Sequence, residues 1–206
     1  MSEVVIVRTG SANLASVVGG LERLGAGAVL SEDAGVVRDA PLVVLPGVGA
    51  FGPAITYLRI RGLDVAIRDR VQFAKPLLAI CLGMQMLCQG SEEADGEPGL
   101  GAIPGVLSRF RGSDRVPHMG WNQIKPSPSA RVLQPASMYF ANSYRLEALP
   151  EGWEGATTLY NGRFASAIER GSLLACQFHP ELSGDAGLSL IARWLERARR
   201  REGVPC

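Results

Sequence analysis

The sequence has almost no net charge and no long apolar run, and each of these two features argues against a class of protein. Its 206 residues carry 21 basic and 20 acidic side chains. The resulting net charge of +1 does not indicate an electrostatic nucleic-acid binder. No apolar run approaches the roughly 20 residues of a membrane-spanning helix. Because 47% of the residues are hydrophobic, the chain can bury a core, and we expect one domain over residues 1–206.

The cysteines indicate neither a metal site nor a disulfide framework. The four cysteines are Cys81, Cys88, Cys176 and Cys206. They lack the paired spacing of a zinc site, and two of them lie in apolar runs. The first residues lead directly into an apolar run, without the pattern of a secretory signal peptide. We therefore expect a protein of the reducing cytoplasm, with no bound metal.

Short apolar runs alternate with helical patterns through the first 90 residues. Strands are expected at 3–7, 28–30, 42–45 and 77–80, and helices at 14–24, 53–61, 63–74 and 84–88. This alternation predicts an α/β fold, a three-layer sandwich with a mainly parallel central sheet. Between residues 100 and 168, short apolar runs broken by turn residues predict antiparallel strands, carried as an insertion on the edge of the sheet.

A group of arginines closes the last helical pattern, which starts near 183–185. Cations near a helix C-terminus interact favourably with the helix dipole. We interpret the group as a helix end rather than as a nucleic-acid patch: Arg193, Arg197, Arg199, Arg200 and Arg201.

One cysteine lies where the strand at 77–80 passes into a helix. Cys81 has small residues, Ala79 and Gly83, two places away on either side. A sharp strand–nucleophile–helix turn needs small neighbours, and a helix N-terminus favours thiolate over thiol. The alternative is a buried structural cysteine. The small–x–Cys–x–Gly spacing at a strand end favours a nucleophile.

The chain holds only two histidines that could serve that cysteine as a base. His179 follows a strand-like run at 173–178, and Glu181 lies two residues further on. A carboxylate at that spacing can hold the imidazole in one tautomer. Since His118 has no such carboxylate, we predict a Cys81–His179–Glu181 triad.

A glycine-rich loop, 46–49, directly follows the strand at 42–45. Glycines let a backbone approach a ligand and expose N–H groups. In an acyl-transfer enzyme, Val48 and Gly49 could supply one oxyanion donor, and the N–H of Leu82 the other. A plain strand-to-helix turn is the alternative. Because glycines flank Val48, we also hypothesise that its peptide flips and hides a donor until activation.

These motifs resemble those of the class I, triad-type glutamine amidotransferases. The class resemblance is carried by C-L-G-M-Q at 81–85 and H-P-E at 179–181. Three further stretches resemble the glutaminase subunits of imidazole glycerol phosphate synthase: P-G-V-G at 46–49, P-H-M-G-W-N at 117–122 and Y-F-A-N-S-Y at 139–144. The resemblance covers nearly the whole chain. It implies a flavodoxin-like fold and hydrolysis of L-glutamine without a metal or organic cofactor.

The resemblance also implies which residues hold the substrate. Glutamine contacts fall on Gly47, Gln85, Ser143 and Tyr144. Without the family, Gln85 is simply a helix residue. The sequence departs from the family pattern at Ala79, Asn142 and Leu182, where glycine, histidine and lysine are usual.

The implied partner is a (β/α)₈-barrel cyclase, which takes up the ammonia to make imidazole glycerol phosphate and AICAR in histidine biosynthesis. The docking residues would be Asn13, His118, Met119, Trp121 and Asn122. We expect 117–122 to be a loop with its Met and Trp facing solvent. From the residues alone, Asn13 is equally well a helix cap, and the Met and Trp could be core residues.

Three other functions fit parts of the pattern. The chain could be the glutaminase of another synthase, such as pyridoxal phosphate synthase, but P-H-M-G-W-N argues against it. A non-catalytic regulatory scaffold is disfavoured by the intact set of Cys81, His179 and Glu181. A cysteine peptidase also remains open at this point.

Overall fold

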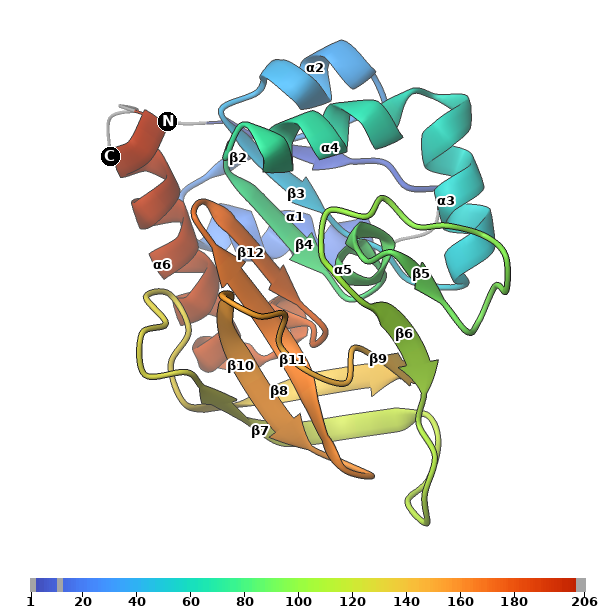
Figure 1. Ribbon diagram of the computed structural model, residues 1–206. Helices are drawn as coiled ribbons and strands as arrows, with labels where there is room; N and C mark the ends of the chain where they lie inside the picture. Colours follow the sequence, from blue (N-terminus) through green and yellow to red (C-terminus); the bar gives the residue numbers. More distant parts are fainter. Residues whose placement is uncertain (1–2, 11–12, 203–206) are drawn as a thin grey trace.

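The computed structural model describes residues 3–10 and 13–202, with side chains up to residue 200; Cys206 and the Arg201 side chain lie outside it. Nine strands form the main sheet: β1 (Glu3–Val7), β2 (Gly27–Ser31), β3 (Leu42–Leu45), β4 (Leu77–Ile80), β7 (His118–Pro126), β8 (Ala136–Asn142), β10 (Glu154–Leu159), β11 (Arg163–Arg170) and β12 (Leu173–Cys176). Their order is β2-β1-β3-β4-β12-β11-β10-β7-β8 (Figure 1). A smaller sheet joins β5 (Gly90–Ser91), β6 (Val106–Arg109) and β9 (Tyr144–Arg145).

The first five strands in this order are all parallel, as the alternating pattern predicts. Every residue of β3, β4 and β12 is buried, because these strands are covered on both faces. Their carboxyl ends therefore meet at one edge of the sheet, where ligands of such folds bind. The predicted α/β sandwich is confirmed.

Helices cover both faces of the parallel strands (Figure 1). Side chains of Val4 and Ile6 pack in the core beneath α1 (Leu14–Arg23) and α6 (Gly184–Glu202). Those of Val5 and Val7 pack in the opposite core, beneath the other helices: α2 (Ala34–Asp39), α3 (Phe51–Ile60), α4 (Leu63–Gln72) and α5 (Leu82–Leu87). The sequence analysis missed α2, since six residues are too few to show helical periodicity. None of the helices within the described residues is both long and apolar enough to cross a membrane.

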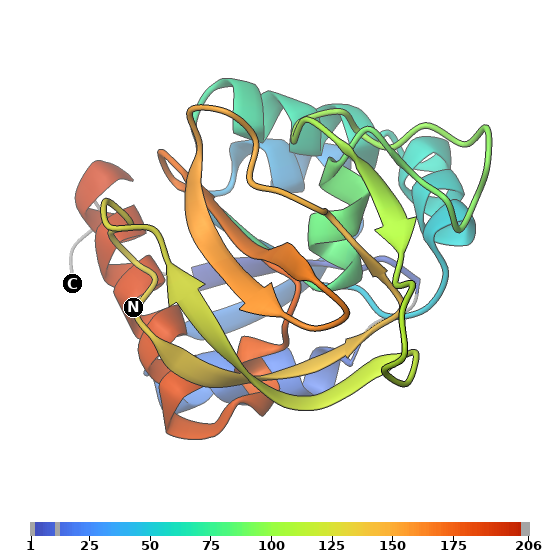
Figure 2. The ribbon, with the colours of Figure 1, turned by 60° about the horizontal axis from the view of Figure 1, so that its bottom comes forward.

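Antiparallel strands extend the sheet beyond β12, as predicted for residues 100–168. β11 pairs with β12 and β10, and β10 pairs with β7. Asn161 and Gly162 form the expected tight turn between β10 and β11, with φ angles of 45° and 98°. The antiparallel pair of β7 and β8 then forms the edge of the sheet farthest from β2 (Figure 2).

The prediction of a loop at 117–122 was wrong, because all but the first of these residues lie in β7. His118 pairs with Asn142 and Trp121 with Tyr139 on β8. The segment alternates between buried and exposed side chains as a strand does, but Gly120 and the preceding proline disguise the pattern. The expected exposure of its large apolar side chains is confirmed, at 66% for Met119 and 58% for Trp121.

Candidate active site

The strand–cysteine–helix turn expected at Cys81 is present. Cys81 directly follows β4 and has φ 53° and ψ −109°, a backbone conformation that residues other than glycine rarely adopt. Its N–H donates to the Cys176 carbonyl at 2.7 Å, which ties the turn to the neighbouring strand. A Cβ on Gly83 would lie 2.0 Å from the Leu45 carbonyl oxygen, so only glycine fits where β3 and α5 meet.

The register of the sheet brings His179 to the same place. β12 lies beside β4 in parallel, with Cys176 opposite Ile80, so the chain after each strand emerges at the same edge. The His179 imidazole lies close enough to the Cys81 sulfur for that group to raise the imidazole pKa, and both side chains line one cavity. The histidine Nδ1 lies 2.8 Å from Glu181 Oε1. Glu181 follows directly in the short helix η1 (Pro180–Leu182), which explains the spacing of two residues.

The electrostatics of this cluster favour a protonated imidazole. Burial alone would lower the pKa of His179, but its hydrogen bonds to Cys81 and Glu181 and the attraction of both groups raise it to about 10. The imidazole and the carboxylate are almost fully buried, so water screens their interaction little. A proton donor is therefore held beside the sulfur at neutral pH.

Gln177 is part of this site, although the sequence analysis did not single it out. Its side chain is fully buried, and Nε2 donates to the Cys81 sulfur at 3.7 Å. Its Oε1 accepts from Gln85 Nε2 at 3.0 Å, and Gln85 also reaches the Tyr144 carbonyl at 3.4 Å. A polar residue at the end of an apolar strand, two places before the histidine, was the signal that could have revealed it.

A cavity of about 220 Å³ opens above the sulfur. The side chains and loops around it come from five different parts of the chain: Val48, Gly49, Cys81, Leu82, Gln85, Glu93, Ala141, Asn142, Ser143, Tyr144 and His179. The cavity thus brings together most of the residues expected to bind substrate. Gly47 is not among those that line it, because it is buried against the Leu82 side chain. The size suits a small metabolite.

Two lining residues add polar groups that the sequence analysis did not assign to the site. Asn142 donates from Nδ2 to the Tyr144 carbonyl at 2.9 Å, while its Oδ1 has no hydrogen-bond partner among the described residues. Glu93 accepts from the Phe51 N–H at 3.0 Å and brings a carboxylate to the cavity. Across the described residues, no group of three or more His, Cys, Asp or Glu side chains is arranged so that it could hold a metal ion.

One of the expected oxyanion donors is occupied by the protein itself in this conformation. The Leu82 N–H donates to the Gly47 carbonyl at 3.3 Å. Gly49 has φ 102°, which a residue with a side chain adopts only with strain, while Val48 lines the cavity beside it. The loop therefore blocks one expected donor with one of its own carbonyls.

The residues expected to meet a partner fall into separate groups. Met119 and Trp121 lie on the exposed face of β7, where Trp121 contacts Tyr139 edge-on. His118 is only 3% exposed and stacks between Phe140 and Tyr160, with ring centroids 4.7 and 3.9 Å away. Burial lowers the pKa of His118 to about 4, which keeps it neutral. Its burial argues against a direct partner contact by this side chain.

The other two expected contacts have structural roles of their own. Asn13 is exposed and caps α1, where its Oδ1 accepts from the Ser16 N–H at 3.4 Å. Asn122 is half-buried and donates from Nδ2 to the Leu159 carbonyl at 3.1 Å. Both remain accessible to a partner in part.

Comparisons with known proteins find a matching family model and several similar sequences. The family model for glutamine amidotransferase class-I matches residues 30–197. The chain is 40% identical to the imidazole glycerol phosphate synthase subunit HisH of Symbiobacterium thermophilum, over 94% of this chain and 93% of that protein. It is 44% identical to HisH of a Synechococcus strain, over 92% and 91%.

A longer relative and a solved structure complete the comparison. The chloroplastic imidazole glycerol phosphate synthase hisHF of Arabidopsis thaliana is 38% identical over 94% of this chain, which spans 34% of that protein. A crystal structure of a glutamine amidotransferase superposes with a TM-score of 0.77 at 23% identity, covering 94% of this chain and 98% of the other. This last likeness concerns the fold.

Proposed function

This chain belongs to the class-I glutamine amidotransferases, and on that premise we propose that it hydrolyses L-glutamine to L-glutamate and ammonia for a synthase partner. One observation supports this more than any other. Cys81 and the hydrogen-bonded pair of His179 and Glu181 meet at a small cavity at the carboxyl edge of the sheet. A cysteine whose proton has passed to an oriented imidazole is the thiolate that attack on an amide needs.

The cavity offers partners for both ends of glutamine. The substrate's ammonium group would meet the Glu93 carboxylate and the unpaired Asn142 Oδ1. Its α-carboxylate would accept from the backbone around Ser143 and Tyr144, and its amide would lie over the sulfur of Cys81. A hydrogen-bonding site of this kind rejects analogues that leave its buried polar groups unpaired.

The chemistry then follows in two halves. The Cys81 thiolate forms a C–S bond to the amide carbon, and the C–N bond breaks as His179 gives its proton to the leaving ammonia. Water next attacks the glutamyl thioester with His179 as base, which releases glutamate and restores the thiol. Glu181 holds the imidazole in one orientation throughout.

The oxyanion loop sets when this reaction runs. Donors at Val48 or Gly49 and at Leu82 would each stabilise the developing oxyanion by about 3–4 kcal/mol. The Leu82 N–H must first exchange the Gly47 carbonyl for the substrate. We expect a peptide flip near Val48 to release it, triggered by the partner's own substrate. Identical loop conformations in resting and activated crystals would contradict this step.

The partner is a (β/α)₈-barrel cyclase that makes imidazole glycerol phosphate and AICAR in histidine biosynthesis, forming a heterodimer in the cytoplasm. Support comes from the full-length relatives, which are subunits of that synthase, and from the plant protein named hisHF. Met119 and Trp121 form the exposed apolar patch for docking. Ammonia protonated in bulk water would lose its nucleophilicity, so direct transfer across this interface is required.

The test separates the two reactions of the complex. Cys81→Ala should abolish glutamate release yet leave synthesis from added ammonium salt intact in the reconstituted complex. Cys88→Ala, which removes a buried cysteine outside the cavity, should leave both reactions unchanged. Loss of both reactions in Cys81→Ala, despite complex formation, would contradict the proposal. If the chain instead supported product formation by another synthase, the glutaminase activity would stand and the proposed partner would be wrong.

A further inference from the structure

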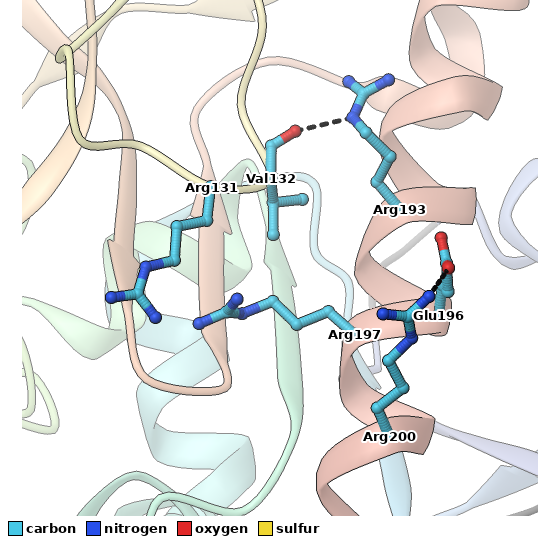
Figure 3. Close-up of a pocket in the computed structure, with 6 residues that line it drawn as sticks. All are labelled: Arg131, Val132, Arg193, Glu196, Arg197 and Arg200. Carbon is cyan, nitrogen blue, oxygen red and sulfur yellow. Dashed lines mark hydrogen bonds and ion pairs between the residues drawn. The ribbon is translucent and has the colours of Figure 1, made fainter.

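Four arginines line a cavity of about 410 Å³ away from the active site (Figure 3). Arg131 comes from the loop between β7 and β8, and Arg193, Arg197 and Arg200 come from α6. From this arrangement we propose a binding site for a condensed phosphate, such as pyrophosphate or triphosphate.

The cavity has positive charge that the protein leaves uncompensated. Its one lining carboxylate, Glu196, is paired with Arg200. Arg131, Arg193 and Arg197 form no ion pair with any described residue, and Glu154 attracts Arg131 only from beyond ion-pair distance. Two of these side chains, Arg131 and Arg197, line the same cavity and point toward one another in Figure 3. Like charges held together in this way favour an anion between them.

The elements that carry the arginines are held in place before any ligand arrives. The buried carboxylate of Glu169 accepts from the backbone N–H groups of Arg131 and Val132 at 3.0–3.3 Å. The Val132 carbonyl accepts from Arg193 Nε at 2.8 Å, which orients that side chain (Figure 3). Arg197 Nε is buried and has no acceptor among the described groups. Preorganised donors lose less entropy on binding.

The lining selects the ligand class. Planar guanidinium groups suit bidentate contacts to phosphate-type oxygens better than lysines do. Val132 is the one apolar residue of the lining, and no aromatic ring is there to stack on a base or sugar. An excess of three positive charges matches a di- or triphosphate better than a single phosphate.

The position separates this site from catalysis. A small neighbouring cavity shares Val132 and Arg197 with it and reaches Leu173, the first residue of β12. Cys81 and His179 lie beyond the carboxyl ends of the same parallel strands. The arginine cavity is therefore at the opposite edge of the sheet, and its ligand would not compete with glutamine.

Calorimetric titration of the full chain with sodium triphosphate, at constant ionic strength, tests the site. We expect one triphosphate per chain, and about tenfold weaker binding in Arg131→Gln and in Arg197→Gln. Arg163→Gln removes the same charge at the far end of β11 and should bind like the wild type. Glu196→Gln, which frees Arg200, should bind more tightly.

Three results would overturn the assignment. They are no measurable binding, equal weakening in Arg163→Gln and Arg197→Gln, and protection of Cys81 from iodoacetamide by triphosphate. Equal weakening would indicate general charge attraction, and protection would place the anion in the catalytic cavity. None of these results bears on glutamine hydrolysis, which Cys81→Ala tests separately.

Discussion

The buried histidine of β7 should make the protein lose stability in mild acid. His118 lies among aromatic rings, and burial lowers its pKa to about 4 in the folded chain. In the unfolded chain its pKa is near 6.5. Between these values the unfolded chain binds a proton that the folded chain cannot accept, so stability falls as pH falls. From pH 7 to pH 5 the loss is about 2 kcal/mol.

The variant His118→Phe isolates this contribution, because phenylalanine keeps an aromatic ring in the stack and does not titrate. Urea unfolding at pH 7 and pH 5 should show the wild type losing about 2 kcal/mol more than the variant. Other titrating groups affect both proteins and cancel in the difference. Trp121→Phe, on the exposed face of the same strand, should behave like the wild type.

Proton NMR gives a second measurement, since the chain has only two histidines. The His118 resonance should stay constant down to about pH 5, and its absence from His118→Phe assigns it. The remaining His179 resonance should titrate well above 6.5, because its partners raise its pKa. A His118 midpoint near 6.5, or equal pH dependence of stability in both proteins, would refute the reasoning.

Two further predictions concern the nucleophile and the docking patch. Gln177→Leu should slow alkylation of Cys81 by iodoacetamide about tenfold, because the sulfur loses its amide donor. An unchanged rate in a folded variant would show that this contact does not affect the reactivity of the sulfur. Trp121→Ala should weaken cyclase binding by about 2 kcal/mol or more, measured by calorimetry, whereas Ile60→Ala, an exposed apolar position on α3, should not. If both variants changed cyclase binding equally, Trp121 would not be at the interface.

Much of the fold could be predicted from local patterns. The fully apolar runs 42–45 and 77–80 are typical of strands covered on both faces, and both are such strands in the structure. Asn161–Gly162 specified its turn through backbone conformation alone. Where the periodicity was short or interrupted, as in α2 and β7, local patterns misled or were silent.

The chemistry of the candidate site was also local in part. Cys81 with its small neighbours, and His179 with Glu181 two residues on, could be identified because each group lies within a few residues of the chain. Glu93 and the free oxygen of Asn142 could not, since their roles depend on residues far away in sequence. Gln177 gave only a partial signal, a polar residue at a strand end, and its contact with the sulfur appears only in the structure.

The sequence by itself therefore determined the parallel strands, and it indicated the nucleophile and its base, because backbone preference and side-chain chemistry act over short distances. Only the tertiary structure decided which groups meet. The register of β12 against β4 places Gln177 at the sulfur, and the return of the chain after β3 lets Gly47 block the Leu82 N–H. The packing of α6 beside the β7–β8 loop brings Arg131 and Arg197 to the same cavity. Such pairings depend on the packing of distant segments, which no local pattern encodes.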